Sequence, residues 1–132
     1  MRGLHLTADL RGCAATSAVM TMPAALRSAC LAAVAAAGLT PVGELFHRFA
    51  TTNDAASSAG ITGVVLLAES HVAVHTWPEL GAAPLDVYVC NLGADNSRRA
   101  EALLATLIDA FAPTSVERHA LERGAQPSRV AG

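Results

Sequence analysis

Six segments of this chain have the residue pattern of β-strands, and only two have apolar residues at helical spacing. In the first strand, residues 4–10, leucine and alanine alternate with His5, Thr7 and Asp9. Further strands are predicted at residues 41–50, 61–68, 71–76, 84–90 and 115–121, with a loop at 51–60 and a loose tail at the end of the chain. The order strand, helix, strands, helix, strand predicts an α+β fold with a mainly antiparallel sheet.

The two helices are identified by their apolar stripes. We expect the first to open with Thr21 and Pro23 and to end at Gly38, and the second to run from a cap at Asn96 or Ser97 to Pro113. Two helices cannot cover both faces of a six-stranded sheet, so we expect a two-layer sandwich with both helices on one face. A second copy of the chain is the simplest cover for the other face. The stripes are Leu26, Cys30, Ala33, Val34 and Ala37, and then Ala100, Leu103, Leu104, Leu107, Ile108 and Phe111.

Length and composition predict a single domain over residues 1–132, since 52% of the residues are hydrophobic and a chain of this size can bury a core. A net charge of -2 provides no electrostatic attraction to nucleic acid or to an anionic membrane surface. No apolar run is long enough to cross a bilayer. The cysteines, Cys13, Cys30 and Cys90, lack the spacing of a disulfide framework or a zinc site. We therefore expect a cytoplasmic protein.

The chain contains no lysine, because all nine of its basic residues are arginine. This absence excludes a lysine Schiff base with pyridoxal phosphate, a phosphate-binding lysine and a lysine general base.

The segment most suited to chemistry is residues 68–79, Ala-Glu-Ser-His-Val-Ala-Val-His-Thr-Trp-Pro-Glu. A metal site is one interpretation, but His71 and His75 on one strand are about 13 Å apart, so no metal site is expected. A hydrolase is a second, although Ser70 lacks the glycines of a nucleophile elbow. In the third interpretation, Ser70 attacks the carbonyl of Glu69. The resulting ester could then break and leave an N-terminal pyruvoyl group, which could take over the Schiff-base chemistry of the missing lysine.

The string E-S-H-x-x-x-H-T-W-P-E, followed by D-V-x-x-C, resembles the S-adenosylmethionine decarboxylases of the short prokaryotic class, which are pyruvoyl enzymes of polyamine synthesis. The agreement is densest from Gly60 to Cys90. It extends more weakly to G-x-H-L and D-L-x-G-C near the start, to F-H-R-F, and to E-R-G near the end.

The resemblance implies self-cleavage between Glu69 and Ser70, into a β chain of residues 1–69 and an α chain of residues 70–132 that begins with the pyruvoyl group. It implies that His75 is the acid or base of the cleavage and that Thr62 supports it. It also implies S-adenosylmethionine as the substrate, for spermidine synthesis, and a homodimer of αβ units.

Three further residues receive roles from the resemblance. Cys90 corresponds to the cysteine that returns a proton to the substrate carbon after carbon dioxide leaves. Glu79 corresponds to a glutamate that binds substrate, at the ribose hydroxyls, and Phe49 lies near the expected position of an adenine-stacking phenylalanine.

The chain departs from the family pattern in places that concern substrate recognition. Leu80-Gly81-Ala82 replaces an aromatic pair, the loop after Phe49 is longer, and Asn91 follows Cys90 in place of glycine. Two alternatives therefore stay open. The same fold and cleavage could serve the decarboxylation of arginine or ornithine, or the chain could be an unprocessed binding or regulatory subunit.

Overall fold

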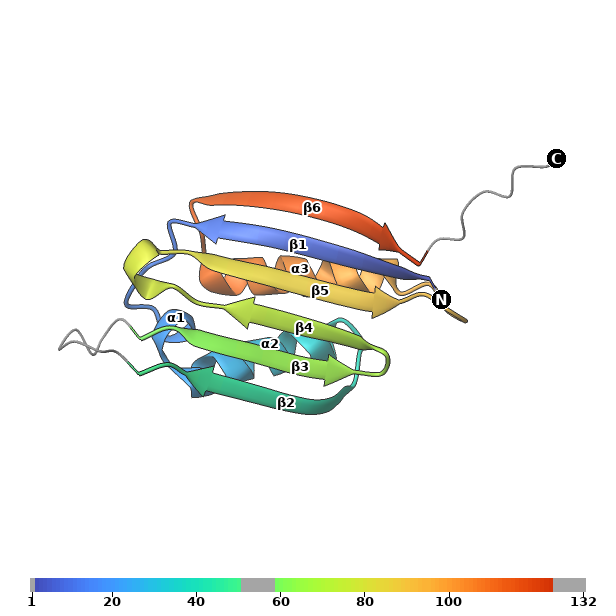
Figure 1. The fold of residues 1–132 in the computed structure, drawn as a ribbon, viewed down its shortest axis with the longest axis horizontal. Helices are drawn as coiled ribbons and strands as arrows, with labels where there is room; N and C mark the ends of the chain where they lie inside the picture. The colour runs from blue at the N-terminus through green and yellow to red at the C-terminus, as the bar shows by residue number, and fades with distance from the viewer. Residues whose placement is uncertain (1, 51–58, 125–132) are drawn as a thin grey trace.

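The computed structural model describes residues 2–50 and 59–124, and it contains a six-stranded sheet in the order β2-β3-β4-β5-β1-β6 (Figure 1). Every neighbouring pair of strands is antiparallel. Residues 51–58 of the predicted loop at 51–60, and residues 125–132 of the predicted loose tail, lie outside the described residues. The strands are β1 (Gly3–Arg11), β2 (Pro41–Arg48), β3 (Ile61–Leu67), β4 (Ser70–His75), β5 (Ala83–Cys90) and β6 (Ser115–Arg123).

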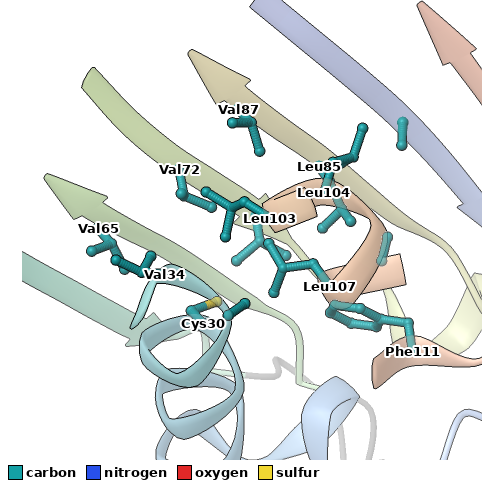
Figure 2. Close-up of a cluster of buried hydrophobic side chains, with 14 of the residues drawn as sticks. Cys30, Val34, Val65, Val72, Leu85, Val87, Leu103, Leu104, Leu107 and Phe111 are labelled. Atoms are coloured by element: carbon teal, nitrogen blue, oxygen red, sulfur yellow. The ribbon is translucent and has the colours of Figure 1, made fainter. Parts of the chain in front are cut away.

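The two long helices, α2 (Pro23–Ala36) and α3 (Ser97–Phe111), lie behind the sheet in Figure 1, on one face, which confirms the predicted architecture. The core fills the space between helices and sheet. Alternate residues of the central strands, including Val65, Val72 and Leu85, meet the stripes of both helices there (Figure 2). None of the described helices is long and apolar enough to cross a membrane.

The first long helix begins differently from the prediction. A short helix, α1 (Ala18–Thr21), precedes α2, so Thr21 ends α1 and Met22 occupies the N-cap position before Pro23. Proline still stands at the first helical position, where its missing N–H leaves no hydrogen bond unmade.

At the start of α3, Asn96 occupies the N-cap position, as predicted, but its side chain makes no capping hydrogen bond. The carboxylate of Asp95 instead accepts a hydrogen bond from the Ser97 backbone N–H, at 2.9 Å, and this bond lowers the pKa of Asp95. Because the lowered pKa favours the ionised carboxylate in the folded protein, the cap stabilises the helix above the ordinary pKa of aspartate. The contribution is lost as the pH falls through the lowered value.

The other face of the sheet, which we call the uncovered face, has no helix on it within the described chain. Exposed apolar side chains on it include Leu45 on β2, Leu66 on β3 and Leu121 on β6. Polar and titratable residues occupy its centre, where His5 Nε2 lies 3.0 Å from Asp86 Oδ1 and Tyr88 stacks on His71. All side chains predicted to carry out chemistry on β3, β4 and β5, apart from Ser70 at the strand end, belong to this face by strand alternation.

Candidate active site

A strained two-residue turn joins β3 to β4, and the predicted cleavage bond follows it directly. Leu67 pairs with Ser70 across the hairpin, so Ala68 and Glu69 form the turn. Glu69 has φ of +53°, in the left-handed region that favours glycine, and this costs an ordinary residue about 1 kcal/mol or more. Sequence patterns could locate the turn but not the sign of this φ.

Ser70 is held against the end of β5. Its Oγ accepts a hydrogen bond from the Cys90 backbone N–H, at 3.0 Å. Cys90 is fixed at two further atoms, because its carbonyl accepts a bond from Asn96 Nδ2 at 2.8 Å and its Sγ accepts one from the Leu92 N–H at 3.4 Å. We call Glu69, Ser70 and Cys90 the cleavage-site cluster. Within it, the hydroxyl that would attack and the thiol that would donate a proton belong to neighbouring strand ends.

We expect Glu69→Gly to raise the free energy of unfolding by about 1 kcal/mol, because glycine adopts the left-handed φ without strain. Urea unfolding of the uncleaved chain, with Ser70→Ala in the background, measures this change. Ala68→Gly is the matched control, since Ala68 does not have a positive φ, and it should lower stability by about 0.5 kcal/mol. Equal effects at the two positions would show that the turn stores no strain.

The predicted processing pair lies at the opposite end of the same hairpin. Thr62 on β3 and His75 on β4 are direct cross-strand partners, and Thr62 Oγ1 lies 2.9 Å from His75 Nδ1. One hydrogen bond therefore fixes the orientation of the imidazole and leaves its Nε2 available for proton transfer.

A cavity of about 320 Å³ opens beside this pair, and we call it the His75 cavity. It brings together four of the residues predicted from the sequence: Phe49, Thr62, His75 and Glu79. Glu79 lines the cavity from the short 3-10 helix η2 (Pro78–Leu80). Phe49 lines it from the residue after β2, and about half of the surface of Phe49 is exposed. The other phenylalanine of this segment, Phe46 on β2, does not line the cavity and packs against the core. An aromatic ring and a carboxylate around a largely apolar cavity are suited to a nucleoside.

The cleavage-site cluster and the His75 cavity are separated by the length of β4. Ser70 and His75 are its first and last residues, and five residue steps along a strand span about 16 Å. A proton transfer needs its two groups within about 3 Å, or one water molecule between them. Within one chain, His75 therefore cannot act on Ser70.

Burial makes two of the cysteines poor nucleophiles. It raises the pKa of the Cys30 thiol to about 12, and it also raises the pKa of Cys13. We expect iodoacetamide at pH 8 to leave Cys30 unmodified in the folded protein and to modify it once urea unfolds the chain, because only the thiolate reacts. Peptide mass mapping measures the modification, and rapid labelling of folded Cys30 would contradict the packing described.

Sequence reasoning missed Thr76, which is the residue that joins the His75 cavity to the core. Val72 and Val74 face the core on β4, and strand alternation puts a hydroxyl next in that apolar row. A polar residue in a core-facing row was the signal from which a buried, hydrogen-bonded Thr76 could have been predicted. Over residues 2–50 and 59–124, the structure groups no three histidine, cysteine or acidic side chains that could hold a metal ion.

Known proteins resemble this chain over almost its whole length. A family model described as S-adenosylmethionine decarboxylase matches residues 4–124. The S-adenosylmethionine decarboxylase proenzyme of Archaeoglobus fulgidus is 33% identical over 122 residues, which cover 92% of this chain and 97% of that protein. The proenzyme of Aquifex aeolicus is 35% identical over 122 residues, covering 92% and 81%.

A solved structure extends the similarity to three dimensions. The crystal structure of the adenosylmethionine decarboxylase from Aquifex aeolicus is 32% identical, with a TM-score of 0.80 over 98% of this chain and 97% of that one. Sequence and fold agree over almost the whole length, and the chain therefore belongs to the S-adenosylmethionine decarboxylase family.

Proposed function

We propose that the chain cleaves itself between Glu69 and Ser70 and, in its mature form, decarboxylates S-adenosylmethionine with the pyruvoyl group that forms at residue 70. Membership of the family supports the reaction, and the strained turn at the cleavage bond supports the processing. The residues present fit this group, because a serine stands directly after the strained residue, with its Oγ held by the backbone N–H of Cys90 on the neighbouring strand.

The cleavage begins when Ser70 Oγ loses its proton and bonds to the carbonyl carbon of Glu69. The bond from that carbon to the nitrogen of residue 70 breaks, and the nitrogen takes up a proton, which leaves an ester. The Cα proton of residue 70 then leaves and the Cβ–Oγ bond breaks, which releases the Glu69 carboxylate and leaves dehydroalanine. Water adds to this group and ammonia departs, which yields the ketone. An imidazole that can both accept and donate a proton suits these steps.

In the mature enzyme, the pyruvoyl group supplies a carbonyl that condenses with the substrate amino group and accepts electrons from the bond to the carboxylate. Cys90 donates a proton to the substrate α-carbon after carbon dioxide leaves. Glu79 accepts hydrogen bonds from the ribose hydroxyls, and Phe49 stacks on the adenine. The exposed ring of Phe49 and the position of Glu79 on the His75 cavity support these roles.

We further propose that two copies pack through their uncovered faces. The cleavage-site cluster and the His75 cavity lie at opposite ends of β4, so neither end holds a complete set of residues. A two-fold axis between the faces, running across the strands, brings each Ser70 to His75 of the partner subunit and forms two equal sites. The exposed leucines on the face support this contact.

The observation that carries the proposal is the positive φ of Glu69 directly before a serine whose Oγ is held by the Cys90 N–H. Intact mass spectrometry tests the cleavage and should find two chains, of residues 1–69 and 70–132. Release of labelled carbon dioxide, measured in parallel with S-adenosylmethionine, arginine and ornithine, tests the substrate. We expect release from S-adenosylmethionine. A single unmodified chain would overturn the whole proposal, whereas release from another substrate would overturn only the choice of substrate.

We expect Cys90→Ala to cleave into two chains yet release carbon dioxide at least a hundredfold more slowly, because the backbone N–H that bonds Ser70 Oγ is kept while the proton donor is lost. Mass spectrometry follows the first result and carbon dioxide release the second. Cys30→Ala removes a buried thiol far from the cluster and is the matched control. Full turnover by Cys90→Ala would exclude Cys90 as the donor.

A further inference from the structure

Thr76 holds together three elements at the edge of the His75 cavity. Thr76 is 3% exposed. Among residues 2–50 and 59–124, it is the only polar residue that is buried. Its Oγ1 accepts a hydrogen bond from the Ile61 N–H and donates one to the Met20 carbonyl, both at 2.9 Å. The hydroxyl therefore joins the start of β3, the end of β4 and helix α1.

The hydroxyl replaces a backbone group in the sheet. The Thr76 N–H donates to the Ile61 carbonyl at 2.8 Å, as in a regular antiparallel pair. The return bond, from the Ile61 N–H, goes to Thr76 Oγ1 rather than to the Thr76 carbonyl. That carbonyl turns toward Gly60, where an added Cβ would lie only 2.3 Å from the carbonyl oxygen. The chain can thus leave the sheet toward Trp77 and Glu79 without an unpaired N–H at Ile61.

Thr76 and its hydrogen-bond partner Ile61 are the chain neighbours of the processing pair. Ile61 precedes Thr62 and Thr76 follows His75, while Thr62 Oγ1 and His75 Nδ1 lie 2.9 Å apart. A small shift of either strand end would lengthen this bond directly. We propose that Thr76 is a positioning residue, which sets the distance and orientation of the Thr62–His75 pair through the core. This inference rests on the proposed self-cleavage and concerns a residue that does not itself touch the reacting bond.

Thr76→Val tests the inference because valine has almost the shape of threonine but lacks the hydroxyl. The buried Met20 carbonyl and Ile61 N–H lose their partners, and the strand ends must shift to regain hydrogen bonds. We expect the cleavage of freshly purified protein to slow by about tenfold to a hundredfold, the range that small misplacements of reacting groups produce. Thr76→Ser keeps the hydroxyl and should cleave within about threefold of the wild-type rate.

Two controls separate positioning from a general loss of stability. Leu107→Val in α3 weakens the same core away from the cavity, and it should leave the cleavage rate unchanged. Thr76→Ser is the second control, because it keeps the hydroxyl and should restore the cleavage rate that Thr76→Val loses. If valine prevents folding, Thr76→Ala takes its place.

The decisive measurement combines Thr76→Val with Thr62→Val. If Thr76 acts through the pair, the double variant cleaves little more slowly than Thr62→Val alone, because the bond to be positioned is already absent. Independent effects that multiply, or wild-type cleavage by Thr76→Val, would overturn the inference while leaving the proposed function intact. Absence of cleavage in the wild-type protein would instead overturn the proposed function itself.

Discussion

Replacement of Ser70 by alanine is expected to leave the protein as one chain of 132 residues and to abolish carbon dioxide release. Alanine lacks the Oγ that bonds to the Glu69 carbonyl carbon, so neither the ester nor the ketone can form. The effect should exceed that of every other substitution discussed, because one residue supplies both the nucleophilic oxygen and the carbon atoms of the cofactor. Intact mass measured over several days of incubation tests the first result, and labelled carbon dioxide tests the second.

Ser70→Cys is the matched control for this experiment. It keeps a nucleophilic atom on Cβ beside the Cys90 N–H, so the chain should still break, at a reduced rate. If Ser70→Ala yields the same two fragments as the wild-type protein, another nucleophile or a contaminating protease cuts the chain, and the processing mechanism is wrong.

Two inactive variants are expected to restore each other when they are expressed together. Ser70→Ala lacks the nucleophile and His75→Ala lacks the processing imidazole, and these residues lie at opposite ends of β4. In a mixed dimer, one site combines the intact Ser70 of one copy with the intact His75 of the other. Random pairing makes half of the dimers mixed, so about one quarter of all chains should cleave. Gel electrophoresis of the co-expressed proteins, each with its own tag, identifies the cleaved copy as the His75→Ala chain.

Two substitutions in the same cluster of residues provide the negative control. Ser70→Ala and Cys90→Ala both damage the cleavage-site cluster of their own chain, so no mixed dimer has a site with both groups intact. Carbon dioxide release should therefore stay at the level of the separate variants. Restoration by both combinations, or by neither, would contradict sites built from the two ends of facing sheets.

The sheet and the long helices could be predicted from the sequence because each leaves a local signal, and a continuous string of residues pointed to the candidate site. Strand alternation identified β1 and the row of His71, Ala73 and His75, and helical spacing identified α2 and α3. The string from Glu69 to Glu79 carried the chemistry. These signals depend on neighbours in the chain, and local patterns are reliable where the period is regular over many residues.

What could not be predicted depends on contacts between distant segments or on dihedral angles. The left-handed φ of Glu69 has no sequence marker, since glycine or asparagine is the usual residue there. The split of the site follows from the length of β4 and its register with β3, which only the paired strands reveal. The Met20 carbonyl that Thr76 binds belongs to α1, which is too short to show a helical period.

The order of strands in the sheet has a consequence for the proposed cleavage between Glu69 and Ser70. The N-terminal fragment contributes β1, β2 and β3, and the C-terminal fragment contributes β4, β5 and β6, yet β1 lies between β5 and β6. The two products are thus interleaved and cannot separate without breaking hydrogen bonds on both sides of β1. If the chain cleaves as proposed, folding must come first and scission second. Mature enzyme that is denatured would then have to reassemble from two molecules, which makes its recovery depend on concentration.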